Sequence, residues 1–190
     1  MAEKGITLEE RMTPEERELY ERFKEKIGQE FVPNHHEMFF FFGNEDTALL
    51  SRIQRWAIVN EDFNALWFDE EYAKQSRWGG IIAPPLFLIA INDGMGPAAS
   101  LVRDIYSPDC VVKREKYPTF RGSMQTSCDW EFFEPVRPGD KIDTKSKRTE
   151  IYWKQGTRYR LLFTSGETTF TNQKGQLVAH CRAGAVYLFK

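Results

Sequence analysis

The chain has 190 residues, of which 41% are hydrophobic and 14% aromatic, so it can fill the core of one domain. Its 26 Lys and Arg residues nearly balance 28 Asp and Glu residues, which leaves a net charge of −2. The basic residues are spread along the sequence and do not form the basic face that binding to phosphates requires. We therefore expect one domain and no nucleic-acid partner.

The N-terminal sequence is charged where a secretory signal has its apolar centre, so we expect a cytoplasmic protein. The longest apolar run, residues 80–91, is about 12 residues long and contains two prolines, against the roughly 20 residues that span a bilayer. The three cysteines, Cys110, Cys128 and Cys181, are widely spaced and lack a CxxC pair. This pattern predicts reduced thiols and neither a disulfide framework nor a metal site.

A helix is predicted to begin at Thr13, with Pro14 at its first position and Glu16 completing a capping box. Its apolar residues are few, and we expect it to end near Gly28 and to lie on the surface of the domain. We therefore predict an N-terminal helical extension over residues 1–30 and a single domain over residues 31–190.

The next part of the chain alternates between apolar runs and breaks. Residues 38–42 have strand character, and residues 49–59 have apolar residues at helical spacing. Residues 86–96, which follow two prolines, are apolar on nearly every face and predict a buried helix. Residues 100–120 are less periodic and predict a long connection.

The remainder of the sequence predicts antiparallel strands. Cys128, Trp130 and Phe132 alternate with acidic residues, as in a half-buried strand, and Pro138-Gly139 predicts a turn. Three long strands are then predicted at residues 140–155, 158–172 and 176–189, separated by Gly156 and by a turn at residues 172–175. A sheet that wraps a buried helix gives an α+β domain.

Two segments resemble the MaoC-like enoyl-CoA hydratases and hydroxyacyl dehydratases, in particular the FAS1-like dehydratase type. These are DFNALWFDEEYAKQSRWGGIIAPPLF at residues 62–87 and FFEPVRPGDKI at residues 132–142. They occur in the family's order, and the resemblance extends over about residues 30–190. It implies a hot-dog fold, in which an antiparallel sheet wraps a central buried helix.

The resemblance also implies a chemistry. In this family an Asp and a His five positions later add water to, or remove it from, a 2,3-unsaturated acyl thioester, one group removing a proton while the other supplies one. A backbone N–H at the start of the central helix holds the thioester oxygen as it becomes enolate-like. The thioester is carried by CoA or an acyl carrier protein, and no further cofactor or metal is expected.

Carried over by position, the motif's Asp is Asp62, its Asn is Asn64 and its second Asp is Asp69. The histidine position holds Trp67, whose indole can donate a hydrogen bond but has no basic nitrogen. The glycine that would offer the oxyanion-binding N–H is Pro85, which has no N–H. The resemblance therefore predicts vestigial positions and no catalytic residue in this chain.

The same double loss is typical of the non-catalytic subunits of heteromeric family members that act in lipid or steroid metabolism. We accordingly expect a subunit of a hydratase or dehydratase that shapes the acyl pocket, inactive alone, paired in a hetero-oligomer with a catalytic MaoC-like subunit that carries Asp and His. In this interpretation Trp67 fills space in the pocket or core.

Several roles stay open. Asp62 is either a capping carboxylate or a remnant of catalysis, and packing is favoured over ligand contact for Trp67. Candidate substrate-binding residues have competing structural explanations. Leu88, Ile91 and Met95 form a stripe that faces either the acyl tail or the sheet, and Lys113 and Arg114, with Lys116 beside them, contact CoA phosphates or only solvent.

Two rival functions remain at this point. The first is an active homomeric hydratase in which Asp62 works with a displaced base from His35, His36 or His180, although ordinary strand positions are favoured for all three. The second is a non-enzymatic hot-dog protein that binds acyl-CoA.

Overall fold

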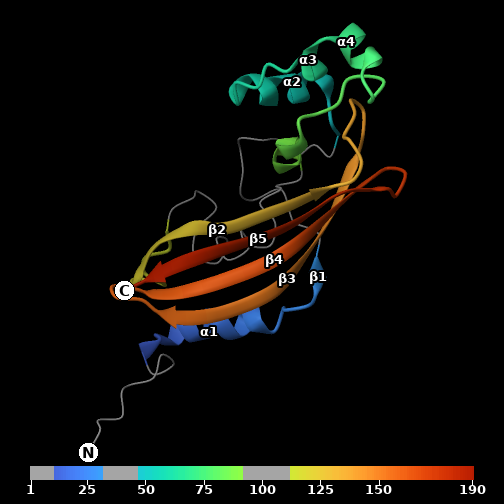
Figure 1. Cartoon of the computed structure of the whole chain (residues 1–190). Coiled ribbons are helices and arrows are strands. Elements are labelled where there is room, and N and C mark those ends of the chain that lie inside the picture. Colours follow the sequence, from blue (N-terminus) through green and yellow to red (C-terminus); the bar gives the residue numbers. More distant parts are fainter. Residues whose placement is uncertain (1–10, 32–46, 92–111) are drawn as a thin grey trace, which may run out of the picture.

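The computed structural model describes residues 11–31, 47–91 and 112–190 (Figure 1). The elements are α1 (Pro14–Lys24), β1 (Glu30–Phe31), α2 (Leu50–Val59), α3 (Ala65–Phe68), α4 (Glu70–Gln75), the 3-10 helix η2 (Pro85–Ala90), β2 (Phe120–Phe132), β3 (Ile142–Gln155), β4 (Arg160–Asn172) and β5 (Leu177–Phe189). Among the described residues, no helix is long and apolar enough to cross a membrane.

The strands form one five-stranded sheet in the order β1-β3-β4-β5-β2, and every neighbouring pair is antiparallel. Along β4 every second side chain is buried, from Arg160 to Asn172, as the period of two requires. The predictions of three long C-terminal strands and of an α+β class are confirmed. The turns also match, because Gly139 and Gly175 have φ of 92° and 73°.

β2 is the edge strand on one side of the sheet, and it is less buried than its alternation predicts. Trp130 does stack on the buried Phe170 of β4, with ring centroids 5.3 Å apart. Cys128 is exposed, however, and 45% of Phe132 is exposed. The prediction of a strand is confirmed, while half-burial is wrong for these two residues, since in the described parts of the chain β2 has a neighbouring strand on one side alone.

α1 lies along β3 (Figure 1), and its capping box between Thr13 and Glu16 is present as predicted. The helix ends at Lys24 and not near Gly28, whose N–H donates instead to the carbonyl oxygen of Arg148 at 2.9 Å. Leu19 and Phe23 belong to the main hydrophobic core, so one stripe of this surface helix is fully covered. The proposed boundary between residues 1–30 and 31–190 stays a prediction.

Residues 86–96 were expected to form a buried helix, and the part of this segment that the structure describes has a different conformation. η2 is a 3-10 helix with hydrogen bonds from Phe87 to Pro84 and from Ile91 to Leu88, and Ile91 already has extended backbone angles. Short 3-10 segments allow few residues before the hydrogen bonds weaken, which accounts for the early end. The residues after 91, the predicted strand at 38–42 and most of the connection at 100–120 lie outside the described residues.

Helices α2, α3 and α4 stand beyond one end of the sheet (Figure 1), and residues 48–83 are here called the overhang. Both ends of the overhang are held by the turn between β2 and β3. Ala48 donates to the carbonyl oxygen of Asp140 at 2.7 Å, and Ala83 donates to that of Val136 at 2.8 Å. The two sequence motifs that carry the family resemblance therefore meet in space.

Candidate functional site

The position of Asp62 is set by the way α2 ends. The N–H of Glu61 donates to Ile58 and that of Asp62 donates to Ala57, at 3.0 and 2.9 Å. This pair of bonds is a Schellman motif, which turns the chain sharply at a residue with positive φ. Glu61 has φ of 55°, a conformation that favours glycine. The half-buried Asp62 therefore directly follows a helix end with strained backbone.

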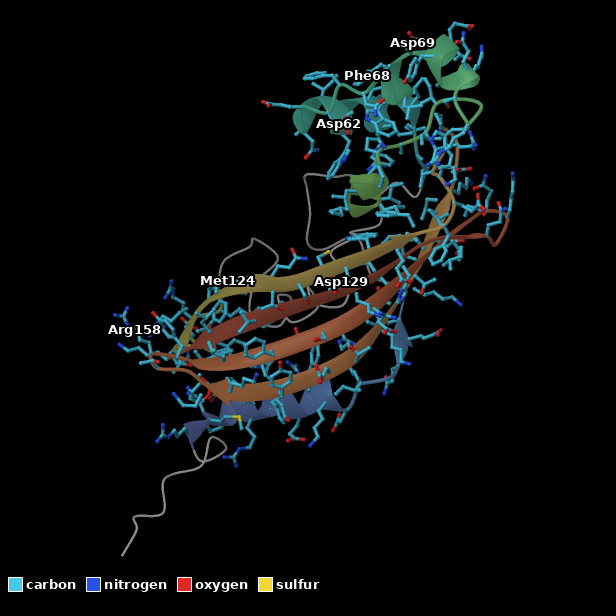
Figure 2. All side chains as sticks on the ribbon, in the orientation of Figure 1. Asp62, Phe68, Asp69, Met124, Asp129 and Arg158 are labelled. Atoms are coloured by element: carbon cyan, nitrogen blue, oxygen red, sulfur yellow. The ribbon has the colours of Figure 1, made fainter. Side chains whose placement is uncertain are left out.

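The three polar residues of the motif accept hydrogen bonds from nearby backbone N–H groups, and two of them, Asn64 and Asp69, are helix N-caps. Asp62 Oδ1 accepts from the N–H of Asn64 at 3.3 Å, and Asn64 Oδ1 accepts from Leu66 at 3.0 Å, at the start of α3. Asp69 Oδ1 accepts from Tyr72 at 3.0 Å, at the start of α4. Figure 2 shows Asp62 and Asp69 on the overhang, away from the sheet. Asp62 itself forms a local turn with Asn64 and is not the N-cap of a helix, so its role stays a prediction.

Trp67, which the sequence resemblance assigns to the position of the family's histidine, is 6% exposed. It packs with Ala57 of α2 and Ile82 in a small second core, against which Leu66, Phe68 and Trp78 are partly buried. The indole Nε1–H has no acceptor among the described residues. Trp67 is thus a packing residue of the overhang whose indole N–H makes no hydrogen bond with the described residues. The indole has no basic nitrogen, so it cannot take up a proton.

Pro85 opens η2 and is exposed, while Phe87 and Leu88 behind it are buried. At the first position of this helix the chain offers a proline ring in place of an N–H group. By the sequence resemblance, Trp67 and Pro85 take the positions of the family's base and of its oxyanion donor, and this assignment stays a prediction.

The other candidate residues are not brought to one place. Leu88 and Ile91 are 1% and 0% exposed and belong to the main core. Lys113 and Arg114 are exposed in the segment before β2. Met95, the third member of the predicted stripe, lies outside the described residues, so the substrate-binding role of this set stays a prediction.

Of the three histidines proposed as displaced bases, only His180 lies among the described residues, and it is on β5 while Asp62 is on the overhang. His180 lies in β5 between the buried Ala179 and Cys181, so its side chain is on the opposite face of the sheet from the core. His35 and His36 lie outside the described residues. In the described parts of the chain, no group of three His, Cys, Asp or Glu side chains is arranged to hold a metal ion.

One feature of the site was missed by sequence reasoning. Around Asp62 the overhang exposes Ile58, Val59 and Phe63, which are 54%, 74% and 70% exposed. The sequence does contain a signal for this surface, because Ile58 and Val59 make the apolar stripe of α2 wider than the face on which Ile53 and Ala57 are buried. Clustered exposed apolar side chains of this kind mark an interaction surface.

Residues 44–181 match the family described as FAS1-like, dehydratase domain region. Because this match spans most of the chain, the protein belongs to that family, whose members are hydratases and dehydratases with the hot-dog fold. Among curated proteins no relative matches the sequence.

Solved structures confirm the hot-dog fold. The ChsH1-ChsH2 complex from Mycobacterium tuberculosis has a chain with a TM-score of 0.63 at 17% identity, covering 90% of this chain and 94% of that one. The MaoC-like dehydratase from Rhodospirillum rubrum gives 0.56 at 20% identity, with 86% and 93% covered. The HadBC (3R-hydroxyacyl-ACP dehydratase) complex from Mycobacterium tuberculosis gives 0.51 at 16% identity, with 84% and 90% covered.

Proposed function

We propose that this protein is the non-catalytic subunit of an acyl-thioester hydratase or dehydratase, in which a second hot-dog subunit carries the Asp and His that move protons. The observation that carries the proposal is the buried Trp67 at the histidine position, in a chain that belongs to the dehydratase family. An active homomeric enzyme needs a base beside Asp62. The described contact of the Asp62 carboxylate is the N–H of Asn64, and Ile58, Val59 and Phe63, which lie near it in sequence, are apolar.

The combined loss of the general base and of the oxyanion donor favours a non-catalytic subunit over an active enzyme with one altered residue. Removing a general base costs about 10²–10⁴-fold in rate, and removing one oxyanion donor costs about 10²–10³-fold. Trp67 and Pro85 remove both at once, while the fold and the family segments around them are retained. Retention of the scaffold without the chemistry is expected of a subunit that positions substrate for a partner.

The exposed surface of the overhang supports a partner. Ile58, Val59 and Phe63 lie beside Asp62 and leave apolar area in water, and covering such area is favourable by about 25 cal/mol per Å². Two of the structures similar in fold, ChsH1-ChsH2 and HadBC, are complexes of unlike chains. By analogy, we propose that a catalytic MaoC-like chain covers this surface.

Within the complex, this chain would set which acyl tails are accepted. Met95 follows the apolar η2 segment in sequence, and replacing it by Trp should lower kcat/KM for bulky acyl groups more than for a four-carbon one. Equal losses for long and short substrates would assign Met95 to core packing and remove support for the tail-binding role. The substrate carrier, CoA or acyl carrier protein, is proposed from the family.

Co-purification tests the proposal. An affinity-tagged chain is isolated from its source, the associated chain is sequenced, and hydration of enoyl-CoA substrates is measured for the lone chain and for the complex. We expect a partner with the intact Asp and His motif, activity in the complex and none in the lone chain. Turnover by the lone chain that disappears in Asp62→Asn would instead identify a homomeric hydratase. Tight acyl-CoA binding without turnover in any assembly would identify a binding protein.

A further inference from the structure

Two cysteines meet on the face of the sheet that carries the core. Cys128 of β2 pairs with Ala183 of β5, and Cys181 of β5 pairs with Trp130 of β2, so the two cysteines are diagonal neighbours. Successive side chains of a strand alternate between the faces of the sheet, which places both sulfurs on the same face. The two Sγ atoms are 3.9 Å apart, although the residues are 53 positions apart in the sequence.

The two thiols differ in their access to solvent. Cys128 is exposed, whereas Cys181 is 2% exposed. Burial, aided by nearby Cys128, raises the pKa of Cys181 from 9.0 to about 12, so Cys181 keeps its proton at neutral pH. An oxidant in solution therefore meets Cys128 first. An exposed thiol beside a second thiol that can resolve it is typical of redox-sensitive cysteines.

The sulfur of Cys128 is held in place by a tryptophan. Trp130 Nε1 donates to Cys128 Sγ at 3.0 Å. The ring of Trp130 is itself fixed, because it stacks on the buried Phe170 of β4 with centroids 5.3 Å apart. The hydrogen bond therefore keeps Cys128 Sγ on the core face of the sheet, next to Cys181.

A disulfide bond between the two cysteines requires a small movement of the edge strand. Bonded sulfurs are about 2.05 Å apart, so the two Sγ atoms must approach each other by about 2 Å. Within the described parts of the chain β2 pairs with β5 alone, and the register of this pair shifts between Gln125 and Ser127, directly before Cys128. Such a shift interrupts the ladder of hydrogen bonds locally and lets the strand bend.

We propose that Cys128 and Cys181 form a reversible oxidation site, at which a peroxide converts the two thiols into a disulfide bond between β2 and β5. In the first step the thiolate of Cys128 attacks one peroxide oxygen, the O–O bond breaks, and Cys128 becomes a sulfenic acid as hydroxide leaves. In the second step the sulfur of Cys181 attacks that of Cys128, the S–OH bond breaks, and the departing hydroxide takes the Cys181 proton. Overall, two thiols and one hydrogen peroxide give one disulfide and two water molecules.

The oxidation site lies within this chain, so it is independent of the proposed function. The disulfide would join the edge strand covalently to its neighbour and would remove the exposed thiol. One of its sulfurs would remain near solvent, and exposed disulfides are the ones that thiol reductants reopen by exchange. The site would therefore return to two thiols when glutathione or another thiol reductant is in excess.

Oxidation of the full chain in a Cys110→Ser background tests the proposal. The chain is treated with hydrogen peroxide at neutral pH, the remaining thiols are blocked with iodoacetamide under denaturing conditions, and the peptides are mapped by mass spectrometry. We expect a link between Cys128 and Cys181 within one chain, which dithiothreitol reverses. In Cys181→Ser the sulfenic acid of Cys128 loses its nearby thiol, and dimedone should trap about tenfold more of it than in the parent chain.

The matched control moves the exposed thiol to the other face of the sheet, by Cys128→Ser combined with Asp129→Cys. Asp129 is the next residue of β2, is exposed and pairs with Arg182 (Figure 2). Its side chain points away from Cys181, so we expect no link at the peroxide concentration that links Cys128. Equally fast linking from position 129 would mean that opening of the sheet brings the sulfurs together, and it would overturn the proposal. Oxidation of Cys128 to a sulfinic acid without any link to Cys181 would do the same.

Discussion

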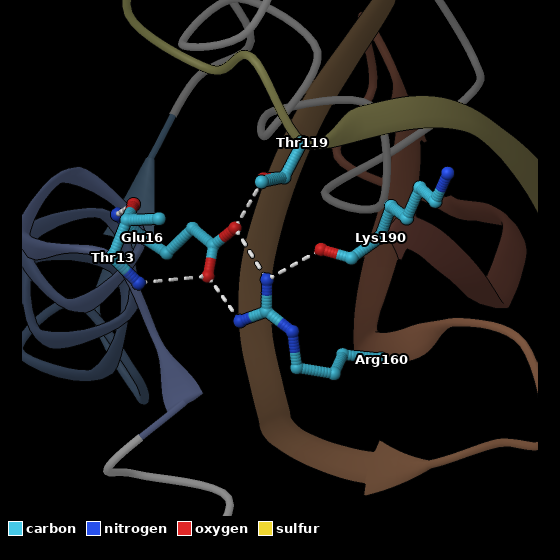
Figure 3. Close-up of polar contacts among 5 residues, drawn as sticks. All are labelled: Thr13, Glu16, Thr119, Arg160 and Lys190. Atoms are coloured by element: carbon cyan, nitrogen blue, oxygen red, sulfur yellow. Dashed lines mark hydrogen bonds and ion pairs between the residues drawn. The ribbon is translucent and has the colours of Figure 1, made fainter.

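Glu16 of α1 and Arg160 of β4 form a buried ion pair that joins residues 144 positions apart in the sequence (Figure 3). Arg160 Nη2 donates to Glu16 Oε1 at 3.0 Å and to the carbonyl oxygen of Lys190 at 3.0 Å. The carboxylate also accepts from the hydroxyl of Thr119 and from the N–H of Thr13. One glutamate therefore caps its own helix and fastens that helix to the sheet.

Breaking this pair from one side should be strongly destabilising. Glu16→Gln leaves the guanidinium of Arg160 buried without its counter-charge, and we expect the free energy of unfolding to fall by about 3–5 kcal/mol in urea titrations. Replacing both residues, Glu16→Leu with Arg160→Met, should cost less than Glu16→Gln alone. The control is Glu18→Gln, which removes an exposed pair with Lys116 at 3.7 Å and should cost under about 1 kcal/mol. Similar small losses for Glu16→Gln and Glu18→Gln would contradict the account.

The helix end before Asp62 offers a stabilising change. Glu61 holds φ of 55° in the Schellman motif, and a non-glycine residue in this region costs about 1–2 kcal/mol. We expect Glu61→Gly to raise the urea midpoint by the equivalent of about 1 kcal/mol, while Glu61→Ala, which keeps the strain, should leave it nearly unchanged. A destabilised Glu61→Gly variant would show that the glutamate side chain makes a contact worth more than the strain.

The cysteines of β2 and β5 should differ in reactivity. Burial, aided by nearby Cys128, raises the pKa of Cys181 from 9.0 to about 12, so its thiolate fraction near pH 8 is about a thousandfold below that of an ordinary cysteine. Cys128 is exposed. In a Cys110→Ser background, mass spectrometry after brief iodoacetamide treatment at pH 8 should find Cys128 modified and Cys181 intact. Equal labelling of both would mean that the sheet opens at this edge.

The same pKa shift predicts the direction of a pH effect on stability. The native state keeps the Cys181 proton up to about pH 12, whereas the unfolded chain loses it near the ordinary value of 9.0. The contribution of Cys181 is therefore fully present below pH 9 and is lost as pH rises from 9 toward 12. Urea titrations across this range should show a smaller decline in Cys181→Ala. An equal decline in that variant would assign the effect to other groups.

The strands and turns of the sheet were predictable because their signals are local. Alternation along residues 158–172, glycine at position 175 and the capping box at Thr13 each depend on a few neighbouring residues. For the same reason, the sequence predicted only a capping role for Glu16, because no residue near it in sequence indicates the ion pair with Arg160.

The burial of a strand and the type of a helix were harder to predict, because they depend on which distant parts of the chain pack against that element. Cys128 and Phe132 alternate as core residues do, yet β2 is an edge strand. The apolar run after Pro84 predicted a buried helix, and the described part is buried but wound as a 3-10 helix. At the candidate site, the sequence identified Asp62, Asn64 and Trp67, and it missed the exposed apolar side chains beside them.

The central claim, that this chain performs no proton transfer, is tested most directly by the rate of enoyl-CoA hydration with and without the carboxylate of Asp62. Wild-type chain and Asp62→Asn are each assayed alone and in the complex with the co-purified catalytic subunit. We predict no turnover by either lone chain, and kcat values for the two complexes that agree within about twofold. A fall in kcat of about a hundredfold or more in the Asp62→Asn complex, on the scale of losing a general base, would contradict the claim and make Asp62 a catalytic residue.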